Sequence, residues 1–85
     1  MDEADLRAVV LRSLGEIAPE ADLAGLDHRG DLREELELDS LDILNLAIRL
    51  YEATGIDVPE RDYAKIVTVD GCVDYLGGRL EGRAG

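Results

Sequence analysis

The spacing of the apolar residues is the feature that most limits how this chain can fold. Near its start, Leu6, Val9, Val10, Leu14 and Ile17 recur at intervals of three and four, the spacing of one helix face. The same spacing returns twice further along, and no stretch alternates apolar and polar residues convincingly as a half-buried strand does. The pattern therefore predicts an all-α fold.

The chain has 85 residues, enough for one domain with a small core. We expect residues 1–85 to form a small four-helix bundle, with three main helices, one short helix and a long first loop. The first helix should end before Pro19, since the residue preceding a proline disfavours helical backbone. Residues 18–38 then form the long connection. We expect its leucines to pack on the core, and the connection has room for a short turn of helix.

The second main helix is expected to open at Ser40. Asp39 is a good N-cap, and Asp42 resembles the partner of a capping box. The expected core stripe of this helix consists of Leu41, Leu44, Ala47, Ile48 and Tyr51. Further apolar residues at Ile43, Leu46 and Leu50 leave little of the helix polar. Such a helix is either deeply buried or keeps a face for a ligand or partner.

The last third of the chain is expected to hold a short helix and a longer one. Gly55 should end the preceding helix in the left-handed conformation, and Pro59 should start a short helix reaching about Lys65. Thr68 can cap the final helix, whose stripe is Val69, Cys72, Val73, Leu76 and Leu80. Because Gly77-Gly78 interrupts this stripe, we expect the helix to stop near Leu76 and residues 79–85 to fray.

The charge is strongly one-sided, with 20 acidic and 9 basic residues and a net charge of -11. This argues against nucleic acid and anionic membranes and favours basic partners, although a solvated acidic face would look the same. A single cysteine, no signal peptide and no membrane-spanning run predict a cytoplasmic protein, complete from Met1. The net charge makes a monomer the default.

Ser40 is the residue that most invites a chemical role. Asp39 and Asp42 flank it, and nothing nearby could activate it as a nucleophile. The only histidine, His28, lies in the preceding loop, so we do not expect an enzyme. His28 and Cys72 are each single, which gives no metal site. An exposed, fixed and unreactive hydroxyl suits modification by another enzyme.

The run Asp39-Ser40-Leu41-Asp42 resembles the phosphopantetheine attachment site of acyl carrier proteins. The downstream chain keeps that family's order, with Gly55, Ile56-Asp57-Val58-Pro59, Lys65-Ile66-Val67-Thr68-Val69 and Asp74-Tyr75-Leu76. The resemblance covers roughly residues 5–78. It implies a carrier domain in which a phosphopantetheinyl transferase attaches 4′-phosphopantetheine from coenzyme A to Ser40. The arm's thiol would carry an acyl group as a thioester for fatty-acid, polyketide or related specialised biosynthesis.

The resemblance also implies a docking surface and an acyl cleft. The surface would meet basic patches of acyl-loading and acyl-transfer enzymes, and its expected residues are Asp39, Leu41, Asp42, Glu52, Asp57, Glu60 and Asp62. In family members an acyl chain can sit between the helices. By analogy, the expected cleft residues are Ile43, Leu46, Ile48, Leu50 and Ile66.

Two departures from the family favour a specialised stand-alone carrier. Asn45 stands where fatty-acid carriers commonly have an acid, and Arg49 adds a positive charge to the same helix. Peptide-synthetase carriers often have Gly-Gly-His or Gly-Gly-Asp before the serine, so an aminoacyl or peptidyl cargo is a less favoured alternative. The alternative from another class is an acidic helical interaction module without a prosthetic group.

Overall fold

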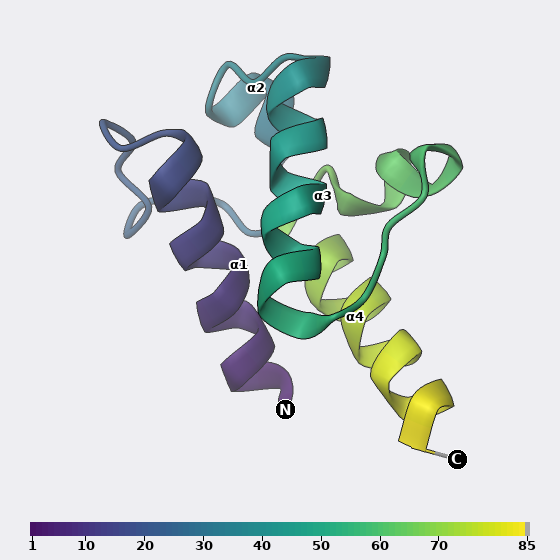
Figure 1. Cartoon of the computed structure of the whole chain (residues 1–85). Helices are drawn as coiled ribbons and strands as arrows, with labels where there is room; N and C mark the ends of the chain where they lie inside the picture. The colour runs from purple at the N-terminus through teal and green to yellow at the C-terminus, as the bar shows by residue number, and fades with distance from the viewer. Residues whose placement is uncertain (85) are drawn as a thin grey trace.

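The computed structural model describes the backbone of residues 1–84 and the side chains of residues 1–81. Within this range the chain is helical and contains no strand, which confirms the all-α prediction (Figure 1). The elements are α1 (Glu3–Ile17), α2 (Leu32–Glu35), α3 (Ser40–Thr54), the 3₁₀ helix η1 (Glu60–Ile66) and α4 (Val69–Ala84).

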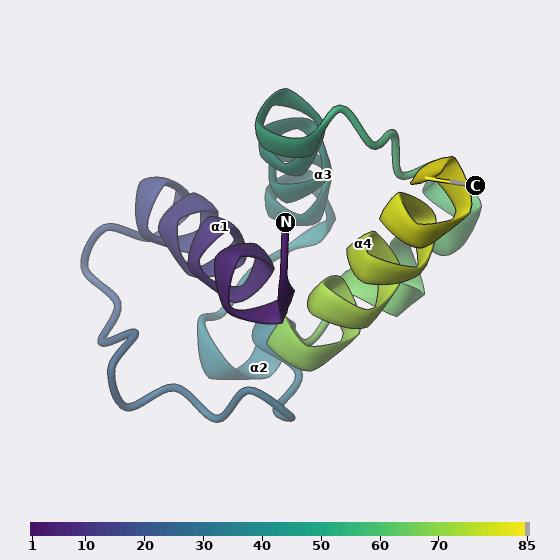
Figure 2. The same cartoon turned by 90° about the horizontal axis from the view of Figure 1, so that it is seen from below.

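The helix α1 packs against both α3 and α4, and η1 also packs against α3 and α4. The connection between α1 and α2 wraps around the outside of this group (Figure 2). Its leucines are partly or fully buried, as predicted. The start of α3 lies beside α2, at the end of the molecule opposite the two termini (Figure 1). The fully buried side chains are Val10, Leu14, Leu32, Leu46, Leu50, Ile66, Val69, Cys72 and Leu76.

The helix ends follow the capping signals of the sequence. Asp39 caps α3 and forms the predicted capping box with Asp42. Gly55 ends this helix with a φ of 75°, the left-handed conformation that glycine adopts without steric cost. The hydroxyl of Thr68 accepts a hydrogen bond from the backbone N–H of Gly71 at 2.8 Å. These three local predictions are confirmed.

The predicted core stripe of α3 is wrong except at Ala47, which is buried as predicted. The buried residues of this helix are Ile43, Leu46, Ala47 and Leu50, whereas Leu41, Leu44, Ile48 and Tyr51 are exposed. Both sets have helical spacing, so periodicity alone could not decide between them. The position of α1 and η1 around the helix decides it, because they cover one set only. The other four residues of the predicted stripe instead form an outward-facing one.

The predicted end of α4 near Leu76 is also wrong, since the helix continues through both glycines to Ala84. Gly77 faces α1, where a side-chain carbon placed on it would lie 3.7 Å from Leu6 Cδ1. Gly78, by contrast, borders open space. Gly85, the last residue of the predicted tail, lies outside the described residues. The predicted short helix exists as η1, a 3₁₀ helix with Pro59 as its N-cap rather than its first residue.

Candidate functional site

Ser40 is the first residue of α3 and is exposed. The backbone N–H of Asp42 donates to Asp39 Oδ1 at 2.9 Å, and that of Asp39 donates to Asp42 Oδ2 at 3.2 Å. Both carboxylates are therefore occupied with the backbone of the first turn. The Ser40 hydroxyl forms no hydrogen bond with any described residue. This hydroxyl therefore lies at a capped helix start, and none of the described side chains is hydrogen-bonded to it as a general base would be.

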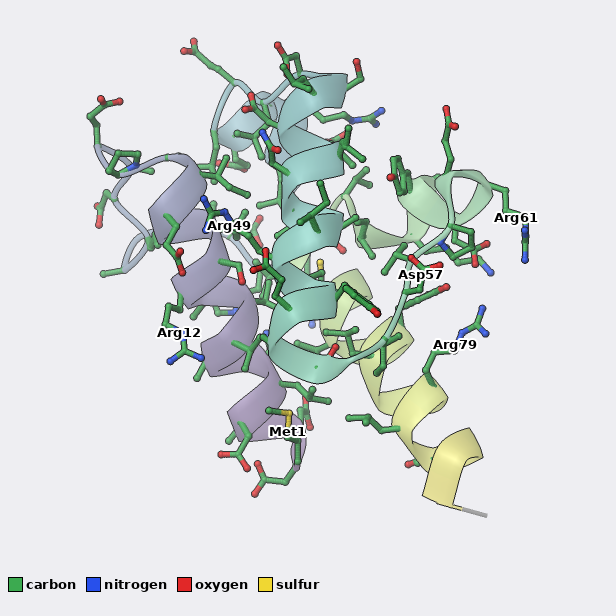
Figure 3. The ribbon with its side chains drawn as sticks, viewed as in Figure 1. Met1, Arg12, Arg49, Asp57, Arg61 and Arg79 are labelled. Carbon is green, nitrogen blue, oxygen red and sulfur yellow. The ribbon has the colours of Figure 1, made fainter. Side chains whose placement is uncertain are left out.

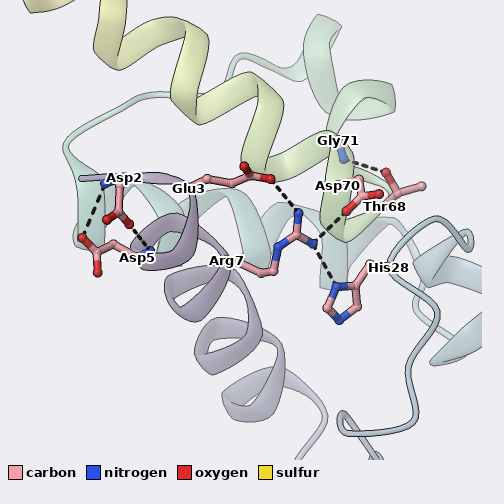
Figure 4. Close-up of polar contacts among 8 residues, drawn as sticks. All are labelled: Asp2, Glu3, Asp5, Arg7, His28, Thr68, Asp70 and Gly71. Atoms are coloured by element: carbon pink, nitrogen blue, oxygen red, sulfur yellow. Dashed lines mark hydrogen bonds and ion pairs between the residues drawn. The ribbon is translucent and has the colours of Figure 1, made fainter.

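His28, the only histidine that could act as a general base, belongs to a polar cluster that joins α1, the long connection and α4. Arg7 Nη1 donates to His28 Nδ1 at 2.9 Å and to Asp70 Oδ1 at 2.7 Å, while Arg7 Nη2 donates to Glu3 (Figure 4). The bond to Asp70 raises the pKa of Arg7. The backbone N–H of Asp70 also donates to the His28 carbonyl at 3.0 Å. The only histidine of the chain therefore anchors the long connection.

A pocket of about 320 Å³ opens beside Ser40, between α2, the start of α3 and η1. Its walls are mainly apolar, and the lining residues are Arg33, Ser40, Ile43, Tyr63, Ala64 and Val67. The sequence pointed to Ser40 and Ile43 only. The other four were missed because they come from the loop, the short α2 and η1, where no periodic pattern marks a face. Arg33 was visible only as a base within an acidic stretch.

The structure supports most of the predicted docking residues as surface residues. Leu41, Glu52, Asp57 and Glu60 are exposed, as is Asp39. Arg49 of α3 reaches towards α1, where it is paired with Glu16 (Figure 3). Beside the predicted acids, the outward face of α3 carries the apolar stripe of Leu41, Leu44, Ile48 and Tyr51.

The prediction that Asp62 belongs to the docking surface is corrected by its burial. A docking residue must lie at the surface, and Asp62 is only 8% exposed. The Tyr75 hydroxyl donates to Asp62 Oδ2 at 2.8 Å, and this bond lowers the pKa of Asp62. Arg79 Nη2 also donates to Oδ2, at 3.4 Å, and Lys65 Nζ lies 3.6 Å from Oδ1. The carboxylate thus joins η1 to α4. Its partners on α4 are far along the chain, so local sequence gave no sign of its burial.

The predicted cleft residues fall into three groups. Ile43 lines the pocket beside Ser40. Leu46, Leu50 and Ile66 are fully buried in the core and do not line that pocket. Ile48 is 46% exposed on the outward face of α3, so its assignment to an internal cleft is wrong. The reason is that α3 buries a different face from the one predicted.

No helix among residues 1–84 combines the length and apolar character needed to cross a bilayer. Likewise, the described side chains include no group of three or more histidine, cysteine or carboxylate residues placed to hold a metal ion.

Comparison with known proteins agrees with this geometry. The family model described as a phosphopantetheine attachment site matches residues 4–76. The acyl carrier protein of Rubrobacter xylanophilus is 39% identical over 75 residues, which cover 82% of this chain and 90% of the relative. A small helical carrier domain is the class that the fold and these matches define, and the chain belongs to the acyl carrier protein family. Such proteins bear a covalently attached 4′-phosphopantetheine and interact with phosphopantetheinyl transferase and biosynthetic enzymes.

Proposed function

We propose that this chain is an acyl carrier whose 4′-phosphopantetheine arm is attached to Ser40. The observation that carries the proposal is the exposed Ser40 hydroxyl, without an internal partner, at a capped helix start beside an apolar pocket. The arm, when attached, supplies a thiol that carries the acyl group as a thioester. The chain supplies the anchor, the pocket and the surface that partners recognise, and no catalytic group.

In the attachment reaction, Ser40 Oγ forms a new bond to phosphorus as the pyrophosphate bond of coenzyme A breaks and the nucleotide part leaves. The hydroxyl proton passes to a base of the transferase, since no described residue of this chain is hydrogen-bonded to Ser40. The N–H groups at the start of α3 favour the resulting negative charge. The carboxylates of Asp39 and Asp42 oppose it, so their contribution lies in capping and in partner recognition.

The surface that partners meet is centred on α3. It combines the outward apolar stripe with acids at both ends of the helix, and its proposed residues are Asp39, Leu41, Asp42, Leu44, Ile48, Tyr51 and Glu52. Asp57 and Glu60 extend it across the next connection. Asp57 lies on the same side of the molecule as Arg61 and Arg79, so this extension is of mixed charge (Figure 3). Partners with an apolar groove rimmed by basic residues fit this surface best.

The pathway is proposed to be fatty-acid, polyketide or related specialised biosynthesis in the cytoplasm, with the carrier acting as a monomer. Asn45 is exposed where fatty-acid carriers commonly have an acid, and the Arg49 charge is taken up by Glu16. The middle helix is therefore less acidic than the net charge of -11 suggests. This supports a specialised role over a housekeeping one.

Intact mass measurement tests the proposal. The protein is weighed before and after incubation with coenzyme A, Mg²⁺ and a broad-specificity phosphopantetheinyl transferase. Ser13 is the only other serine and offers a matched control, because it is buried and its hydroxyl donates to the Val9 carbonyl at 2.9 Å. Wild type and Ser13→Ala should each gain one phosphopantetheine, and Ser40→Ala should gain none while staying folded. Unmodified but folded wild-type protein would favour an interaction module without a prosthetic group.

A further inference from the structure

Arg33 is the one positively charged residue among the six that line the pocket beside Ser40. It lies on α2, which the fold places against the start of α3 (Figure 1). The other walls of the pocket are Ile43, Tyr63, Ala64 and Val67, besides Ser40 itself. A guanidinium group therefore borders the same small space as the proposed attachment point.

Asp31 holds this guanidinium in place. Arg33 Nε donates to Asp31 Oδ1 at 3.0 Å, and Arg33 Nη2 donates to Asp31 Oδ2 at 2.7 Å. A guanidinium has five N–H donors, so three remain available for a second anion. The pair itself is exposed and contributes little to stability, because such pairs are screened by water. Its main consequence is to fix the orientation of Arg33.

The charges around Ser40 show why a cation matters there. Asp39 and Asp42 flank the serine, and Glu34, Glu35 and Glu37 precede it in the chain. A phosphodiester on Ser40 adds another negative charge to this end of the molecule. Close contact between like charges is unfavourable unless a positive group lies between or beside them. Arg33 is the lining residue that can provide this group.

We propose that Arg33 binds the phosphodiester of the arm on Ser40 through the N–H donors that Asp31 leaves available. This deepens the proposed function and rests on Ser40 carrying the arm. Arg33 is then a positioning residue, which holds the root of the arm over the pocket rather than along the outward stripe of α3. Guanidinium and phosphate oxygens are well matched in geometry, so the contact is directional as well as electrostatic.

The test uses nuclear magnetic resonance on apo and holo protein, after intact mass has shown complete conversion of each variant. The variants are Arg33→Gln and the matched control Arg29→Gln, which removes the same charge from an exposed position outside the pocket. In wild type, conversion to the holo form should shift the Arg33 side-chain Nε–H resonance and leave that of Arg29 unchanged. The phosphorus resonance of the holo protein should shift in Arg33→Gln and stay in place in Arg29→Gln. Circular dichroism checks that both variants keep the helical fold.

The outcomes separate the proposed contact of Arg33 from the proposal that Ser40 carries the arm. Wild type that is never modified overturns both proposals, whereas modified wild type with an unmoved Arg33 resonance overturns only the contact with Arg33. If Arg33→Gln alone is not modified, the wild-type Arg33 resonance decides: a shift on conversion supports the contact and an unmoved resonance overturns it. The arm is also loaded with a neutral acetyl group and with a carboxylate-bearing malonyl group. A response of Arg33 to the malonyl form only would make the cargo carboxylate its ligand and overturn the proposal.

Discussion

Alanine substitution at Leu50 and at Leu41 separates the two faces of α3 with the same chemical change on one helix. Leu50 is fully buried and Leu41 is 62% exposed. Replacing a fully buried leucine by alanine costs about 3 kcal/mol, within a range of about 2–5 kcal/mol set by how far the cavity collapses. Leu41 keeps less than half of its surface from water, so its truncation costs about 1 kcal/mol or less. The higher helix propensity of alanine offsets part of that smaller cost.

Urea and thermal unfolding measure both values. For a domain of this size 1 kcal/mol corresponds to about 4–8 °C, so Leu50→Ala should lower Tm by about 12 °C or more. Leu41→Ala should lower Tm by a few degrees at most, while slowing modification and transfer by partner enzymes. Equal losses for the two variants, or a larger loss for Leu41→Ala, would refute the assignment of the faces. The proposed docking stripe would then fall with it.

Three further predictions concern the thiol, the buried carboxylate and the net charge. Burial raises the pKa of Cys72 to about 12, so at pH 8 only about one Cys72 in ten thousand is ionised. A thiol reagent should therefore titrate no thiol in native apo protein and one thiol, that of the arm, in holo protein. Rapid labelling of the native apo form would contradict the burial. The hydrogen bond from Tyr75 holds the pKa of Asp62 below its unfolded value of about 3.9. The carboxylate therefore stabilises the fold above about pH 3.9, and this contribution is lost as the pH falls through the lowered pKa. Asp62→Asn should therefore lower Tm at pH 6 and flatten its fall below about pH 4, unlike Asp57→Asn; identical acid profiles of Asp62→Asn and wild type would refute this. Finally, moderate salt should raise Tm because the charge of -11 repels itself on a small core, whereas a flat response would show that the acids are too dispersed for repulsion to matter.

The parts of the fold that the sequence predicts well are those decided within one helical turn. The caps at Asp39 and Thr68 and the left-handed Gly55 depend on residues that are neighbours in the chain. The parts it misses depend on where other elements lie. Asp62 is buried because α4 brings Tyr75 and its neighbours to it, and the face of α3 is chosen by α1 and η1. Ser40 could be proposed from the sequence because its neighbours in the same helical turn mark it, whereas Arg33 lines the pocket beside it only through the placement of α2.

The division of α3 into two faces also explains how a chain this small can present Ser40 accurately. The buried face fixes the helix against α1 and η1, and the capping box fixes its first turn. With a rise of about 1.5 Å per residue, Ile48 and Tyr51 lie roughly 12 and 16 Å along the helix from Ser40. If the proposed docking on the outward stripe holds, the continuous helix α3 sets the distance between a bound partner and Ser40. Substitutions on the buried face should change stability and leave that distance intact, whereas substitutions on the stripe should change partner encounter and leave stability nearly unaltered.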